Sequence, residues 1–159
     1  MIRFKSFSGF VTEINNATNG NTGCNTIMSV RDRSGNVVNF VVSPDTYFAD
    51  QKIVRVNDFI TGYYDGNAPA ILIYPPQYPA LIVVKYNQSQ HVKVDYFNRQ
   101  LVSSDGKLKL NVASYTQIML KNGQPFSGDI TNRNLVVFYR TTTQSIPAQT
   151  TPSKIIVWC

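Results

Sequence analysis

The side chains that could carry out acid–base or nucleophilic chemistry are few and scattered along this sequence. Its single histidine, His91, has no acidic residue or cysteine as an immediate neighbour, whereas a catalytic histidine needs a nucleophile to activate and a third group to orient it. Two carboxylates could hydrolyse a glycosidic bond, but half of the aspartates stand close to Gly, Pro or Ser, where they stabilise turns: Asp32, Asp45, Asp65 and Asp105. The sequence therefore predicts no catalytic residue and a protein that is not an enzyme.

Patterns that bind metals and cofactors are also missing from the sequence. Cys24 and Cys159 are the only cysteines, they are far apart, and no histidines cluster near them. The glycine-rich segments 19–23 and 103–107 match neither a Walker motif nor a dinucleotide-binding motif. We expect no metal site, no cofactor and no small-molecule substrate. The two thiols could form an intrachain disulfide, form a disulfide between copies or stay reduced, and the sequence leaves all three open.

Basic and aromatic side chains alternate in the second half of the chain, as they do in proteins that bind single-stranded nucleic acid. The formal net charge is +6, and most of the excess lies after residue 86. The candidate nucleic-acid surface consists of Lys93, Tyr96, Phe97, Arg99, Lys107, Lys109 and Tyr115. Because the same alternation is expected of any half-exposed strand, and a modest positive charge also favours solubility, nucleic-acid binding is the alternative hypothesis.

The composition and the spacing of turn residues favour strands throughout the chain. Glu occurs once, whereas Val, Ile, Thr, Tyr and Phe are abundant, so we expect almost no helix. The runs 7–14, 26–31 and 36–43 predict a three-stranded meander with a turn at residues 32–35. With two later runs, 58–64 and 80–86, this order resembles an OB-like barrel.

One pattern occurs twice in the chain: a strand that ends in Tyr, a Pro-x-Gln-x-Pro element and an aliphatic strand. Tyr64 and Tyr139 are 75 positions apart, and Pro79 and Pro152 are 73 apart, so the halves are predicted to be related modules. We therefore expect an all-β protein of two tandem OB-like five-stranded barrels packed together, with a single β-sandwich as the alternative architecture. The predicted modules are residues 1–86 and 92–159, and the polar residues 87–91 form a short joint.

The repeated segments resemble β-repeats of surface and spore-related proteins from spore-forming clostridia. The resemblance covers residues 64–65, 75–80 and 139–152, and some of those proteins also carry a copper amine oxidase-like N-terminal domain, whose name does not imply oxidase chemistry. It implies a location at the spore or cell surface and no particular activity. No secretory leader is visible, so we expect a cytoplasmic location if the protein is not assembled in such a layer. No apolar run approaches the roughly 20 residues of a membrane-spanning helix.

Together these patterns predict a noncatalytic structural β-protein that self-associates, as a subunit of a spore or cell-surface layer or fibre. Alternating apolar residues near the amino terminus could add a strand to a neighbour's sheet, and Cys159 could bond to another copy. The candidate contacts in the homo-oligomer are Ile2, Phe4, Phe7, Cys24 and Cys159. The alternative is a tandem OB-like protein that binds single-stranded nucleic acid, and a third hypothesis is a carbohydrate-binding or hydrolytic module.

Overall fold

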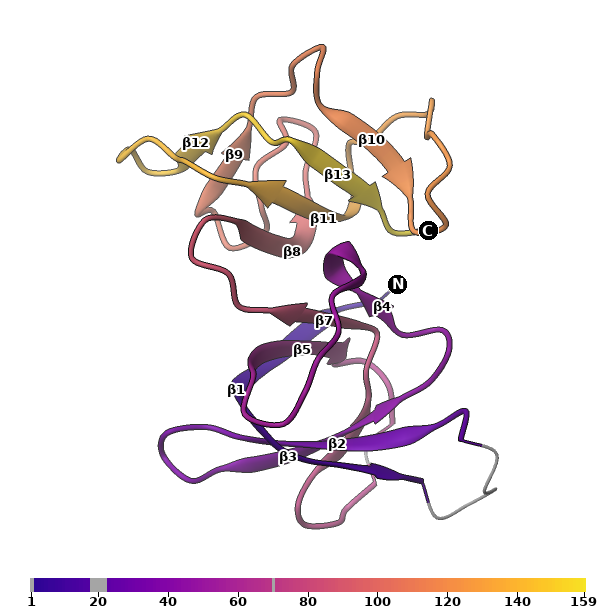
Figure 1. Cartoon of the computed structure of the whole chain (residues 1–159). Coiled ribbons are helices and arrows are strands. Elements are labelled where there is room, and N and C mark those ends of the chain that lie inside the picture. The colour runs from indigo at the N-terminus through magenta and orange to yellow at the C-terminus, as the bar shows by residue number, and fades with distance from the viewer. Residues whose placement is uncertain (1, 18–22, 70) are drawn as a thin grey trace. The chain divides into compact units, whose positions relative to one another are not determined.

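The computed structural model of the chain describes residues 2–17, 23–69 and 71–159 (Figure 1). Strands dominate these residues, and a 3-10 turn, η1 (Ala49–Gln51), is the one helical element among them. The all-β prediction is therefore confirmed, in keeping with strands such as Val37–Val42 that consist mainly of β-branched and aromatic residues. None of the described helical residues forms a helix long and apolar enough to cross a membrane.

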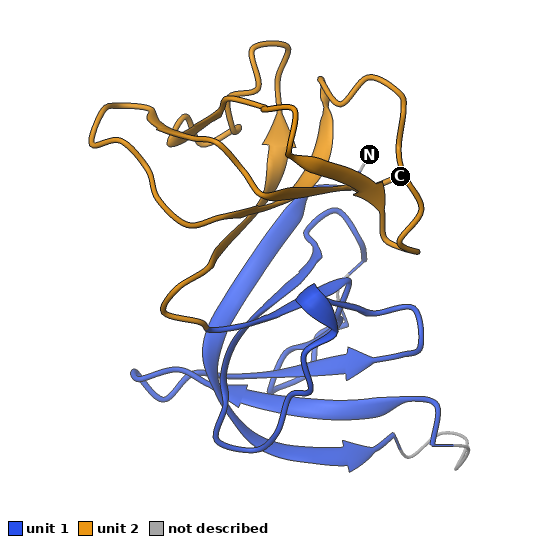
Figure 2. Ribbon diagram, turned by 45° about the horizontal axis from the view of Figure 1, so that its top comes forward, with its two compact units in different colours: residues 1–86 blue, residues 87–159 orange. Residues whose placement is uncertain are grey.

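Contacts within the chain divide it into two compact units, Met1–Tyr86 and Asn87–Cys159 (Figure 2). The polar residues 87–91 belong to the beginning of the second unit, and His91 is the first residue of a strand. Each unit has its own hydrophobic core. The first core includes Val11, Val30, Phe40, Ile60 and Val83, and the second includes Phe97, Leu108, Leu135, Val137 and Ile155.

The first unit begins with the predicted antiparallel meander, which consists of β1 (Phe4–Asn16), β2 (Thr26–Arg31) and β3 (Val37–Val42). In the turn between β2 and β3, Asp32 Oδ1 accepts hydrogen bonds from the backbone N–H groups of Ser34 (3.0 Å) and Asn36 (2.9 Å). Gly35 takes a positive φ of 88° there, a conformation that glycine adopts without steric cost. Local turn chemistry therefore sets the register of this hairpin.

The remaining strands of the first unit join the two edges of this meander. β5 (Phe59–Asp65) pairs with the first half of β1. Then β6 (Gln77–Pro79) pairs in parallel with β3, and β7 (Ile82–Lys85) pairs antiparallel with β5. Between β6 and β7, Ala80 N–H donates to Val41 O (2.9 Å) and Leu81 N–H donates to Tyr63 O (2.8 Å). One continuous segment thus bonds to both β3 and β5, while the short β4 (Tyr47–Phe48) pairs with β7.

The second unit repeats these pairings with different side chains. Its strands are β8 (His91–Phe97), β9 (Leu108–Leu110), β10 (Gln117–Leu120), β11 (Arg133–Tyr139), β12 (Ala148–Thr150) and β13 (Lys154–Val157). β11 lies between β8 and β13 as β5 lies between β1 and β7, and both pairs are antiparallel in both units. The parallel pairs β12 with β9 and β10 with β13 match β6 with β3 and β4 with β7.

The strands do not form the two five-stranded sets that the sequence predicted. Among the described residues, the first unit has a seven-stranded sheet, and the second has a four-stranded and a two-stranded sheet. One reason is that each predicted closing strand is preceded by a separate short strand that contains the Gln of the repeated element. In the first unit the segment changes its partner after Ala80, from β3 to β5, and Pro79 and Pro152 have no N–H to donate to a ladder.

Candidate binding surfaces

The same side-chain hydrogen bonds hold the repeated proline-containing elements in both units. Thr46 Oγ1 donates to Ala80 O (2.8 Å) and accepts from the backbone N–H of Ser43 (3.0 Å). In the second unit, Thr116 Oγ1 donates to Pro152 O (2.7 Å) and accepts from the N–H of Ala113 (3.1 Å). Both threonines therefore attach the start of a short strand to the segment that follows the repeated Gln.

The connection that leads into each of these elements carries exposed apolar side chains. Between β5 and β6, the consecutive residues Ile71, Leu72, Ile73 and Tyr74 are all exposed, and Leu72 is 100% exposed. Ile146, which directly precedes Pro147 in the second unit, is 96% exposed. Tyr74 has the same place before Pro75, and both of these peptide bonds are cis. We call residues 71–74 the apolar loop; contiguous exposed apolar surface of this kind commonly marks an interaction site.

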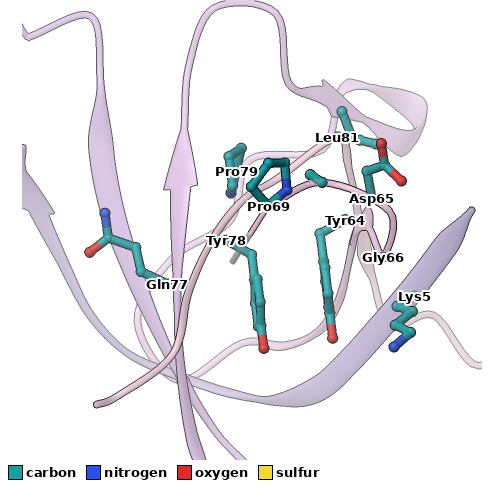
Figure 3. A pocket seen from close by; sticks show the side chains of 10 residues that line it. Lys5, Tyr64, Asp65, Gly66, Pro69, Gln77, Tyr78, Pro79 and Leu81 are labelled. Carbon is teal, nitrogen blue, oxygen red and sulfur yellow. The ribbon is translucent and has the colours of Figure 1, made fainter. Parts of the chain in front are cut away.

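A pocket of about 360 Å³ lies in the first unit next to this connection (Figure 3). The rings of Tyr64 and Tyr78 stack in its wall with their centroids 3.9 Å apart and their planes 5° from parallel. Figure 3 shows Lys5 on the side of Tyr64 that faces away from Tyr78, and Gln77 on the side of Tyr78 that faces away from Tyr64. Asp65, Gly66, Ala68, Pro69, Pro79 and Leu81 complete the lining. We call this site the tyrosine pocket.

The polar groups of the tyrosine pocket are held by neighbouring backbone. Asp65 Oδ1 accepts hydrogen bonds from the N–H groups of Asn67 (2.9 Å) and Arg3 (3.2 Å). The aliphatic stem of Lys5 lies against Gly66, where an added Cβ would come within 2.8 Å of the lysine carbons. Burial, followed by the adjacent phenol of Tyr78, raises the pKa of Tyr64 above its ordinary value. Tyr64 is therefore neutral near pH 7, and both phenols can donate and accept hydrogen bonds.

A second hollow of the first unit, of about 260 Å³, is mainly apolar. It is lined by Ile14, Thr26, Met28, Val42, Phe48, Lys52, Ile53 and Val54. Ile53 is 65% exposed at its rim. Among the side chains that line this hollow, only those of Thr26 and Lys52 are polar and could orient a polar ligand.

The predicted nucleic-acid surface does not form one continuous face. Phe97 is fully buried in the second core, which corrects the expectation that its ring is available to a base. The cause is that both Val94 and Phe97 point inward, so the simple alternation of a strand is broken at the end of β8. Lys93 pairs with Asp105, and Lys109 Nζ donates to Gln100 O (2.9 Å). Of the other candidates, Tyr96 is half-buried, and the exposed ones are Arg99, Lys107 and Tyr115.

The predicted contacts near the amino terminus have roles inside the first unit. Phe4 and Phe7 lie in β1, where they pair with Asp65 and Gly62 of β5, and Phe7 packs against the core. Ile2 is half-buried. Phe4 and Phe7 thus belong to a sheet of their own unit, which argues against their addition to a neighbour's sheet. Cys24 and Cys159 are exposed thiols.

His91 lies at the start of β8, with its ring 5.4 Å from that of Tyr139. Within residues 2–17, 23–69 and 71–159, no group of three or more His, Cys, Asp or Glu side chains is arranged to hold a metal ion. Neither the apolar loop nor the tyrosine pocket was predicted from the sequence. A signal for the loop was visible, since an apolar run stands between Pro69 and Pro75. The tyrosine pair gave no such signal, because Tyr64 and Tyr78 lie on different strands.

No protein-family model and no curated protein matches this chain.

Proposed function

We propose that this protein is a noncatalytic structural β-protein that self-associates, as a subunit of a spore or cell-surface layer or fibre. The observation that carries the proposal is the apolar loop, whose four side chains are exposed in one continuous run. Monomeric soluble proteins seldom expose such runs without a partner. Burying one aliphatic side chain of this size contributes about 1.5–3 kcal/mol, so several together are a strong drive for association.

We further propose that each unit is an OB-like barrel. Support comes from the segment that includes β6 and β7, which bonds to both β3 and β5, and from the matching pairings of β12 and β13. Each unit then presents an exposed apolar residue directly before its repeated proline, Tyr74 in one and Ile146 in the other. Two such contacts on one chain favour open assemblies, because contacts that do not close into a ring generate fibres or layers.

The location is supported by the resemblance of residues 64–65, 75–80 and 139–152 to clostridial spore and surface proteins. The contact assigned to the apolar loop replaces the one that we expected at the amino terminus, because β1 is paired within its own sheet.

The test is the double substitution Ile71→Ser and Leu72→Ser, followed by sedimentation velocity over a range of protein concentrations and by negative-stain microscopy. We expect the wild-type chain to form large species. The double variant should sediment mainly as a monomer, because the contact loses the aliphatic side chains of Ile71 and Leu72. Tyr115→Ser is the matched control, since Tyr115 is 67% exposed but lies outside both repeated connections. Circular dichroism checks that every variant retains its strands.

A wild-type chain that remains a monomer at the highest attainable concentration would contradict self-association. Large species that persist unchanged in the double variant would show that the apolar loop is not the contact. The single change Ile146→Ser tests the second unit in the same way, and a smaller effect is expected there because only one apolar residue is removed.

A further inference from the structure

We propose that the tyrosine pocket binds an uncharged carbohydrate, in the form of one or two sugar residues of a glycan. This function is separate from self-association and does not depend on it. The inference rests on the stacked rings of Tyr64 and Tyr78, on the three polar groups around them and on a comparison of the two units.

The size and position of the pocket suit a small ligand. Its volume of about 360 Å³ is near the lower end of the roughly 300–1,000 Å³ typical of ligand sites. Gly66, Ala68 and Pro69, from the connection between β5 and β6, form part of its wall. In OB-like barrels, the corresponding connection takes part in binding oligosaccharides and oligonucleotides. This one point of support rests on the OB-like fold proposed above, whereas the lining of the pocket does not depend on it.

The apolar part of the pocket is rigid. Tyr64 and Tyr78 restrain each other by stacking, and Pro69 and Pro79 have little conformational freedom. A rigid surface loses little entropy when a ligand binds. A pyranose ring has a face of C–H groups that can lie against the edges of the stacked rings and against the prolines, while its hydroxyl groups point toward polar partners.

The polar part of the pocket favours a ligand without net charge. Lys5 supplies hydrogen-bond donors, Asp65 supplies acceptors, and the Gln77 amide supplies both. Sugar hydroxyls donate and accept, so they can satisfy all three groups. An anion would be repelled by Asp65 and a cation by Lys5, whereas a neutral ligand meets one charge of each sign.

The second unit shows that the tyrosine pair is not required by the repeated fold. Tyr139 has the place of Tyr64, because Ser153 N–H donates to Phe138 O as Leu81 N–H donates to Tyr63 O. In the place of Tyr78 stands Thr150, which is the residue after the repeated Gln and is buried, with its hydroxyl donating to Thr141 O (2.7 Å). The same strand pairings therefore form with a threonine, and the stacked tyrosines are a feature of the first unit.

The experiment measures binding of uncharged oligosaccharides to the full chain by saturation-transfer NMR and calorimetry. The probes are cellotetraose, chitotetraose, laminaritetraose and mannotetraose, with the oligonucleotide dT10 and a tetragalacturonate as charged comparisons. We expect at least one neutral probe to bind, Tyr78→Thr to weaken that binding at least 10-fold, and Tyr78→Phe to weaken it less than 3-fold. Tyr115→Thr, which changes an exposed tyrosine of the second unit, is expected to have no effect.

Two kinds of result would overturn the proposal. One is that no neutral probe binds the wild-type chain at millimolar concentration. The other is that binding is unchanged by Tyr78→Thr, or that dT10 or tetragalacturonate binds more tightly and loses its affinity in that variant. Because Tyr78→Thr could disturb the fold, Lys5→Met is the second variant: it removes the ammonium group, keeps an aliphatic stem against Gly66, and is expected to weaken sugar binding at least 3-fold.

Discussion

Asp105 connects a turn to a neighbouring strand in the second unit. Its carboxylate accepts hydrogen bonds from Lys93 Nζ, from Ser103 Oγ (2.6 Å) and from the backbone N–H of Lys107 (3.0 Å). Partial burial acts to raise the pKa of this carboxyl, but these hydrogen bonds and the charge of Lys93 outweigh it and lower the pKa to about 2. The charged form of Asp105 therefore stabilises the turn between β8 and β9.

The lowered pKa predicts how the stability of the second unit depends on pH. Since the pKa is about 2 in the folded state, below the ordinary 3.8 of an aspartate, the contribution of Asp105 is fully present above about pH 5 and is lost as the pH falls through 2. Asp105→Asn is expected to lower the free energy of unfolding by about 1 kcal/mol at pH 7, given that the pair is partly exposed. Urea unfolding followed by Trp158 fluorescence measures this difference at several pH values.

In that experiment the difference between wild type and Asp105→Asn should shrink as the pH falls below about 5 and disappear only below the folded-state pKa of about 2. Asp45→Asn, a change at an exposed carboxylate of the first unit, serves as the control and should be close to wild type throughout. A difference that grows as the pH falls would contradict the assigned role of Asp105.

At the scale of elements, the same strand pairings occur in each unit, and in each unit a threonine joins the start of a short strand to the segment after the repeated Gln. Thr46 and Thr116 each make one bond to the chain before them and one to the segment after the repeated Gln. Position 62 in β5 must also be glycine, because an added Cβ there would lie 2.5 Å from the ring of Phe40 in β3. Side chains at these positions are thus constrained by strands that are distant in the sequence.

The shared threonine bonds predict similar losses of stability in both units. Thr46→Val and Thr116→Val keep the shape of the side chain but leave a backbone carbonyl and an N–H without their partner, at a cost of about 1–3 kcal/mol each. We expect the larger loss at Thr116, which is buried. Urea unfolding monitored by circular dichroism measures both, and Thr142→Val, at an exposed position, is the control. If either substitution were neutral, that threonine would not stabilise its unit.

At the scale of the whole molecule, the net charge of +6 gives only general attraction to polyanions. Several basic side chains are occupied within the second unit: Lys121 lies over Trp158, Arg133 over Phe126 and Lys154 over Phe138. With Lys93 bound to Asp105, fewer cations remain for phosphates than the sequence indicates. These contacts make nucleic-acid binding less favourable than the composition alone would suggest.

The corresponding prediction concerns the oligonucleotide dT20. We expect no saturable binding at protein concentrations below about 100 µM in 50 mM salt. Nonspecific nucleic-acid binders already associate with DNA at such protein concentrations. Fluorescence anisotropy of a labelled dT20 provides the measurement. Tight binding that weakens steeply with salt, and that is reduced by Lys107→Ala together with Arg99→Ala, would favour the nucleic-acid alternative. An unrelated protein of similar net charge is the control.

The all-β class, the first meander and the recurrence of the proline-containing element could be predicted from the sequence, because strand propensity and turn chemistry act between residues that are close in the chain. Asp32 and Gly35 are examples, since each acts within its own turn. Only the tertiary structure decided that Phe97 is buried and that Tyr64 meets Tyr78. Both outcomes depend on the pairing of distant strands, which the order of residues along the chain does not reveal.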